Sequence, residues 1–162
     1  MGNADMGAGD MGTETSPDMG AVAVNSTTPP VEKDPVEKKP ELTPEQKLDK
    51  DLDSIERMLN REQYGKAKSR IGKIAKDHPN NGRVAALAGR SEVYDNSARA
   101  IREINRAKGL GYNSAEMYLD LATAYFLSGN KGQAKSTYET FLKRYPKHKR
   151  AGEIRAILKN QF

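Results

Sequence analysis

The stretch from residue 115 to residue 148, AEMYLDLATAYFLSGNKGQAKSTYETFLKRYPKH, decides the fold of this chain. Tyr118, Leu121 and Tyr125 follow one another at spacings of three and four residues, which places them on one face of a helix. The polar run Ser-Gly-Asn at 128–130 interrupts this pattern, because these residue types favour turns. The stretch therefore predicts a helix with one apolar face that ends in a tight turn.

The second half of the same stretch carries a pattern that occurs twice more, earlier in the chain. Three apolar columns repeat with gaps of 33 and 34 residues: Ala67, Ala100 and Ala134; Ile71, Ile104 and Tyr138; and Ile74, Ala107 and Phe141. Columns that agree at one period indicate internal repeats, each built from a pair of helices. Pro79 and Pro146 close the second helix of the first and last repeat, because proline cannot continue the helical hydrogen-bond ladder.

This order of large and small positions resembles the tetratricopeptide repeat, in which two antiparallel helices pack around small residues at their crossing point. The resemblance implies an all-α fold, a solenoid of antiparallel helix pairs with about seven helices. The expected units span about 48–81, 82–114 and 115–148, and residues 149–162 form a closing helix. The match is best in the last unit. Where that unit has Tyr118, Leu121 and Ala122, the first unit has Asp51, Ser54 and Ile55, and the middle unit has Ala85, Ala88 and Gly89.

Local signals place the ends of the expected helices. Thr43 followed by Pro44 predicts the first helix start, because a hydroxyl cap and a proline in the first turn both favour initiation. Further starts are indicated at Asn81-Gly82, Asn96-Ser97 and Ser114. After Pro146, an apolar stripe predicts a seventh helix that covers the last open face: Ala151, Ile154, Ile157, Leu158 and Phe162.

Charge divides the chain into an acidic arm and a basic body. Residues 1–43 carry eight acidic and three basic side chains, whereas residues 44–162 carry 14 acidic and 24 basic ones. Residues 1–42 are rich in Gly, Pro, Thr and Asp, which predicts a disordered arm and linker before the helical domain at 43–162. The positive excess falls mostly on the second helices and the closing helix, which form the outer side of tetratricopeptide stacks. A solvated face and a surface for an acidic partner both account for it.

In tetratricopeptide proteins the first helix of each unit lines a concave groove that holds a partner peptide. The resemblance assigns this role to Leu52, Glu56 and Leu59 in the first unit, to Arg83, Ala86, Leu87 and Arg90 in the middle unit, and to Glu116, Leu119, Asp120, Thr123 and Phe126 in the last. Arg83 and Arg90 are seven residues apart and share a helix face, so they form a candidate pair for gripping a carboxylate. The alternative is that they pair with Glu56 or Glu116 on neighbouring helices, and the sequence leaves both open.

Catalytic and metal-binding chemistry find little support in the sequence. The chain has no cysteine, which excludes disulfides and thiolate ligands, and no serine stands in a nucleophile elbow. His78 and His148 are the only histidines, and because neither has a second ligand at metal spacing, both are expected to be exposed turn residues. We therefore expect no enzyme activity, no metal and no cofactor. No apolar run is long enough for a transmembrane segment, and the expected location is cytoplasmic if Met1 is the true start.

Three functions remain as hypotheses. The first is a protein–protein interaction module, a scaffold or adaptor that binds a protein or peptide, an acidic one included, as the C-terminal part of a larger bacterial assembly or signalling protein. The second is a small cytoplasmic chaperone for secreted client proteins, because some of those are three-unit proteins of similar length. The third is binding of nucleic acid or an anionic surface through the basic convex face, which the scarcity of aromatic residues disfavours. The sequence leaves the partner and the oligomeric state open.

Overall fold

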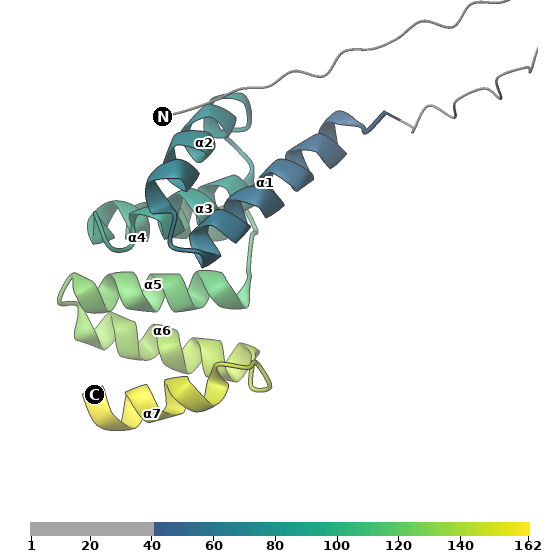
Figure 1. Cartoon of the computed structure of the whole chain (residues 1–162). Helices are drawn as coiled ribbons and strands as arrows, with labels where there is room; N and C mark the ends of the chain where they lie inside the picture. Colours follow the sequence, from purple (N-terminus) through teal and green to yellow (C-terminus); the bar gives the residue numbers. More distant parts are fainter. Residues whose placement is uncertain (1–40) are drawn as a thin grey trace, which may run out of the picture. The chain divides into compact units, whose positions relative to one another are not determined.

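A computed structural model describes residues 41–162, and this part of the chain consists of seven α-helices and their connections (Figure 1). The helices are α1 (Pro44–Asn60), α2 (Tyr64–Asp77), α3 (Gly82–Glu92), α4 (Ser97–Gly109), α5 (Ala115–Leu127), α6 (Lys131–Arg144) and α7 (Ala151–Gln161). No strand occurs between residues 41 and 162, and no helix in this range is long and apolar enough to cross a membrane. The all-α prediction with about seven helices is confirmed here. The predicted disordered arm lies, up to residue 40, outside the described residues.

Side-chain caps fix where several of these helices begin, as the sequence predicted. Thr43 Oγ1 accepts a hydrogen bond from the backbone N–H of Gln46 at 3.2 Å, and Gln46 Oε1 accepts one from the backbone N–H of Thr43 at 3.0 Å. This reciprocal capping box satisfies two N–H groups that the helix itself leaves unpaired. Asn81, Asn96 and Ser114 cap α3, α4 and α5 in the same sense, with side-chain oxygens that accept backbone N–H groups of the first turn.

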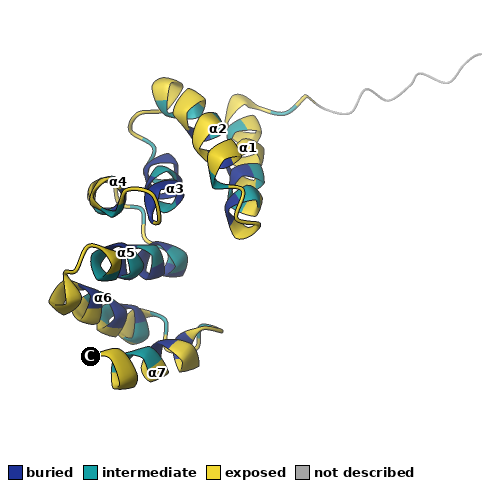
Figure 2. Ribbon diagram, turned by 60° about the vertical axis from the view of Figure 1, so that its left-hand side comes forward, coloured by how far each residue is buried: buried dark blue, intermediate teal, exposed yellow. Residues whose placement is uncertain are grey.

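The helices pack in consecutive pairs, α1 with α2, α3 with α4 and α5 with α6, and α7 packs against α6 (Figure 1). The first helices of successive pairs also contact one another, α1 with α3 and α3 with α5, while α2 contacts α3 and α4 contacts α5. Figure 2 shows that α3 and α5 are mostly buried or intermediate, whereas α2, α4 and α6 have long exposed faces. This is the arrangement of a solenoid, in which each helix pair contacts only the neighbouring pairs.

The pairs cross at small residues. Ala67, Ala100 and Ala134, which form the small column of the repeat, are fully buried in their second helices. Opposite Ala100, Gly89 of α3 lies so close to α4 that a Cβ atom there would come within 2.5 Å of Ile104 Cγ1 and 3.1 Å of the Ala100 carbonyl oxygen. The middle pair therefore depends on the missing side chain of Gly89. Ile55 occupies the same column in α1, and α1 approaches α2 less closely than α3 approaches α4.

The buried apolar side chains form two main clusters. One lies between α1, α2 and α3 and contains Leu52, Ile55, Leu59, Ala67, Ile71, Val84 and Leu87. The other extends from α3 to α7 and includes Tyr118, Tyr138, Phe141 and Ile154. The stripe on α7 covers this second cluster, because Ala151 and Ile154 are buried and Ile157, Leu158 and Phe162 pack against it while partly buried. The prediction of a closing helix is thus confirmed.

Two glycines in helix interiors should respond in opposite ways to substitution by alanine. Gly89→Ala gains helix propensity but forces a methyl group against Ile104 and the α4 backbone, so we expect a net loss of about 1–3 kcal/mol in the free energy of unfolding. Gly72→Ala on α2 meets no atom within 4 Å, so we expect a gain of about 0.5–1 kcal/mol. Denaturant unfolding of both variants checks this, and a stabilised Gly89→Ala variant would contradict the close crossing of α3 and α4.

Candidate functional site

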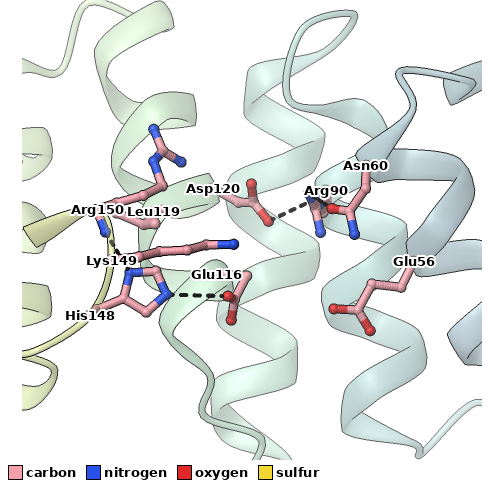
Figure 3. A pocket seen from close by; sticks show the side chains of 9 residues that line it. All are labelled: Glu56, Asn60, Arg90, Glu116, Leu119, Asp120, His148, Lys149 and Arg150. Atoms are coloured by element: carbon pink, nitrogen blue, oxygen red, sulfur yellow. Dashed lines mark hydrogen bonds and ion pairs between the residues drawn. The ribbon is translucent and has the colours of Figure 1, made fainter. Parts of the chain in front are cut away.

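A cavity of about 230 Å³ opens across the first helices of all three pairs. Its lining consists of Glu56 and Asn60 from α1, Arg90 from α3, Glu116, Leu119 and Asp120 from α5, and His148, Lys149 and Arg150 from the segment that leads into α7 (Figure 3). Apart from Leu119, which is 4% exposed, these residues are polar or charged. We call this set of nine residues the charged pocket.

Helix geometry accounts for how each helix presents its side chains to the charged pocket. Glu56 and Asn60 are four residues apart on α1, and Glu116 and Asp120 are four residues apart on α5, so each pair lies on one face of its helix. Arg90 comes from α3, which contacts both α1 and α5. Figure 3 shows Arg90 and Asn60 on one side of the pocket and the side chains of His148 and Lys149 on the other.

Arg83 does not line the charged pocket, because carboxylates of α1 hold it. Its guanidinium donates hydrogen bonds to Asp53 Oδ1 and, at 2.9 Å, to Glu56 Oε2, and it lies 3.7 Å from Asp49 Oδ1. Burial opposes the positive charge, but these hydrogen bonds outweigh it and raise the pKa of Arg83. The hydrogen bond from Arg83 in turn lowers the pKa of Asp53. Arg83 therefore links α3 to α1.

Arg90 is held between α1 and α5. Its Nη2 donates a hydrogen bond to Asn60 Oδ1 at 2.8 Å, and its Nε lies 3.6 Å from Asp120 Oδ2. Only 19% of the Arg90 side chain is exposed. The sequence left open whether Arg83 and Arg90 grip a partner's carboxylate or pair with side chains of neighbouring helices, and the structure shows the pairing. Arg83 pairs with Glu56, one of the two residues named for this role, whereas Arg90 pairs with Asp120 and not with Glu116. Both arginines serve as links between first helices.

Asp120 is the most perturbed acidic group of the pocket. Burial raises its pKa to about 6, and the neighbouring charges of Glu116 and Glu56 act in the same direction, whereas Arg90 and Arg150 oppose the shift. Within residues 41–162 no hydrogen bond to the Asp120 carboxylate is formed, and its only ion pair is the 3.6 Å contact with Arg90. A half-buried carboxylate in this situation is poorly compensated, so a hydrogen-bond donor that enters the pocket would stabilise it.

His148 connects the segment before α7 to α5. Its Nδ1 accepts a hydrogen bond from the backbone N–H of Arg150 at 3.3 Å, which leaves Nε2 facing Glu116 Oε1 at 3.4 Å. The ring packs edge-on against Phe141, with the ring centroids 5.3 Å apart, and 17% of the side chain is exposed. His148 lies in a turn as predicted, but the prediction that it is exposed is wrong, whereas His78 is exposed as predicted.

Lys149 and Arg150 supply positive charge at the wall of the charged pocket that lies opposite Arg90 and Asn60. Arg150 donates two hydrogen bonds of 2.9 Å to Glu153, and these raise its pKa. Lys149 forms no ion pair within residues 41–162, and Figure 3 shows its side chain extending across the pocket. The pocket therefore presents carboxylates from α1 and α5 together with cations from α3 and from the segment before α7.

The structure separates the residues that were expected in a groove. Glu56, Arg90, Glu116, Leu119 and Asp120 come together in the charged pocket. Phe126 lies instead beside a second cavity with Tyr138, Ile157 and Gln161, and its ring packs against Phe162. Thr123 donates its hydroxyl to the Leu119 carbonyl oxygen at 2.9 Å and does not line the charged pocket.

Four of the expected groove residues lie in the core instead. Leu52 and Leu59 are 1% and 2% exposed, and Ala86 and Leu87 are 7% and 5% exposed. Their placement in the groove is corrected, because each first helix packs both against its own pair and against the next first helix. Asn60 and the segment 148–150 are the pocket residues that the sequence did not indicate. Asn60 lies one helical turn after Glu56 and so shares its helix face, which is a signal that the sequence contained. The segment 148–150 lies outside the repeat columns, and no such signal pointed to it.

The charged pocket offers recognition chemistry. Within residues 41–162 no three His, Cys, Asp or Glu side chains are placed to hold a metal ion. The groups that line the pocket are hydrogen-bond donors and acceptors of both charges on a rigid helical frame, which suits the binding of a charged or polar segment.

Residues 116–148 match the tetratricopeptide repeat family. This match covers one helix pair, and the seven stacked helices agree with a repeat fold of the tetratricopeptide type. No curated protein and no solved structure matches the chain. Tetratricopeptide repeats serve in general as protein–protein interaction modules, so the class of function that the family suggests is binding of a protein partner.

Asp120→Asn should remove a pH dependence of stability. Because the folded protein keeps the Asp120 proton up to about pH 6 and the unfolded chain loses it near pH 4, the free energy of unfolding should fall as pH rises through this window. Asparagine mimics the protonated form. We therefore expect the variant to match the parent near pH 4 and to exceed it by about 1–3 kcal/mol at pH 7.5. Denaturant unfolding at several pH values checks this, and parallel curves for the two proteins would contradict it.

Proposed function

We propose that this protein is an interaction module, a scaffold or adaptor, that binds a segment of a partner protein across α1, α3 and α5, with the charged pocket as the anchor. The observation that carries the proposal is the poorly compensated Asp120 carboxylate in a cavity that spans all three first helices. The family match supports a protein partner.

The chemistry of the pocket indicates the kind of side chain that enters it. A lysine or arginine of the partner would supply the hydrogen-bond donors that Asp120 lacks, and Glu116 lies one helical turn away on the same face. Lys149, on the opposite wall, is available for a carboxylate of the same partner segment. The preferred partner segment therefore carries a basic residue, with an acidic residue nearby.

Arg83 and Arg90 support this surface without being its main ligands. Both are engaged with side chains of α1, and Arg90 also with Asp120 of α5, so they hold the first helices in register. A rigid arrangement of this kind lowers the entropic cost of binding, because fewer side chains need to be ordered when the partner arrives.

Selection of peptides from a random display library on the full-length protein tests the proposal. We expect enriched peptides to share a basic residue, and we expect Asp120→Asn to weaken their binding by about tenfold or more at pH 7.5. Glu139→Gln on α6 is the matched control, because it makes the same carboxylate-to-amide change at an exposed residue outside the pocket.

The pH dependence of peptide affinity tests the same site independently. Since Asp120 has a pKa of about 6, affinity for a basic peptide should fall as pH drops below that value in the parent protein and not in Asp120→Asn. Fluorescence anisotropy titrations measure both effects. Enriched peptides that bind equally well to the parent and to Asp120→Asn would contradict the pocket as the anchor. Enrichment of generally apolar, client-like peptides would instead favour the chaperone hypothesis.

A further inference from the structure

A further recess, away from the charged pocket and from the cavity beside Phe126, lies where α2, α3 and α4 meet. It has a volume of about 140 Å³, and we call it the outer groove. Its apolar lining, which we call the floor, consists of Ile71, Gly72, Ala75 and Ala88, and the remaining lining residues, which we call the walls, are polar or charged. It shares no lining residue with the charged pocket.

The outer groove exists because the first two repeats have small residues where the last has large ones. Ala88 of α3 stands in the column of Leu121, and Ala75 of α2 stands in the column of Leu142. Gly72 stands in the column of Glu139, and a Cβ atom at Gly72 would meet nothing within 4 Å. The space above the floor is therefore not filled by side chains of the protein itself.

A buried carboxylate organises the walls. Glu92, whose side chain is 5% exposed, accepts a hydrogen bond from Lys68 Nζ of α2 at 2.7 Å and lies 3.4 Å from Arg99 Nη1 of α4. One buried acid thus fixes a cation from each of two helices at the rim. Each of these cations remains about half exposed, at 43% and 54% of the side chain, and so is accessible to a partner.

Positive charge dominates the helices that border the groove. In α2 there are five basic residues and one acidic residue, and in α4 there are four basic residues and one acidic residue. Lys73, Lys76 and Arg102 are exposed or nearly so and form no ion pair within residues 41–162. The field at this surface therefore attracts negative charge, and salt weakens that attraction.

We propose that the outer groove is a second docking surface, which binds an acidic amphipathic segment of a partner protein. Apolar side chains of the segment cover Gly72, Ala75 and Ala88, and its carboxylates pair with the cations on α2 and α4. A protein segment fits this groove better than nucleic acid does, because the floor is apolar and no aromatic side chain lines it for base stacking. The proposal is separate from the charged pocket and stands or falls independently of it.

The test uses a labelled peptide of about 15 residues in which leucines recur every three or four positions among glutamates, the pattern of an amphipathic helix. In one reference peptide every glutamate is replaced by lysine, and in the other every leucine is replaced by serine. A single-stranded oligodeoxynucleotide is the third comparison. Binding to the full-length protein is followed by fluorescence anisotropy at low and moderate salt. We expect saturable binding of the glutamate–leucine peptide that is weakened by salt, and little binding of the two reference peptides.

Gly72→Glu is the decisive variant. It places a bulky side chain in the groove, with a negative charge that repels the glutamates of the peptide. The Cβ atom of the new residue clashes with nothing in the fold, so the variant should fold normally. Gly132→Glu on α6 is the matched control, because it makes the same change at an exposed helical glycine that also has open space. We expect affinity to fall by about tenfold or more in Gly72→Glu and by less than about twofold in Gly132→Glu. Circular dichroism and thermal unfolding confirm that both variants fold.

The other outcomes overturn the proposal. If Gly72→Glu and Gly132→Glu lose the same amount of affinity, the peptide is attracted by the net charge of the protein and does not occupy the groove. Equal binding of the serine peptide would show that the apolar floor contributes nothing. An oligonucleotide that binds more tightly than any peptide would assign the face to nucleic acid. Asp120→Asn is expected to leave binding of the glutamate–leucine peptide unchanged, which separates this surface from the charged pocket.

Discussion

The close crossing of paired helices at small residues is the constraint on which the rest of this structure depends. Ala67, Ala100 and Ala134 let each second helix approach its first helix, and Gly89 brings α3 into near contact with the backbone of α4. Because dispersion and apolar burial increase with close packing, these crossings strengthen the contact within each pair. The crossings also fix how far each first helix is rotated, and therefore which side chains meet across α1, α3 and α5.

Charge plays two roles on this frame. Arg83, Arg90 and Glu92 are partly or largely buried, and each connects side chains from neighbouring helices. Such pairs add little net stability, since desolvation offsets the attraction, but they favour one relative placement of the helices. The charges that remain accessible, such as Asp120 on one side and Lys73 on the other, are then presented from fixed positions. The charged pocket and the outer groove both hold charges of both signs, but the outer groove also has an apolar floor, whereas Leu119 is the only apolar residue that lines the charged pocket.

Much of the fold was predictable from the sequence because it rests on local signals. The caps at Thr43, Asn81 and Ser114 depend on residues within one helical turn, and the column of buried alanines is visible because it recurs at a nearly constant period. The site was less predictable. Leu52 and Leu87 lie in the core because first helices are covered from two sides, which an amphipathic pattern on one helix does not reveal. His148 reaches Glu116 through the turn before α7, and no repeat column governs that segment.

The placement of residues 148–150 has a consequence for how this solenoid could change in evolution. Repeat proteins commonly grow or shrink by duplication of whole units, because each unit contacts only its neighbours. Here the segment that precedes the closing helix also completes the charged pocket on α5. Insertion of another helix pair between α6 and α7 would carry His148, Lys149 and Arg150 away from Glu116 and Asp120. The number of units between α5 and α7 is thus coupled to the charged pocket, because the segment before the closing helix supplies three of the nine residues that line it.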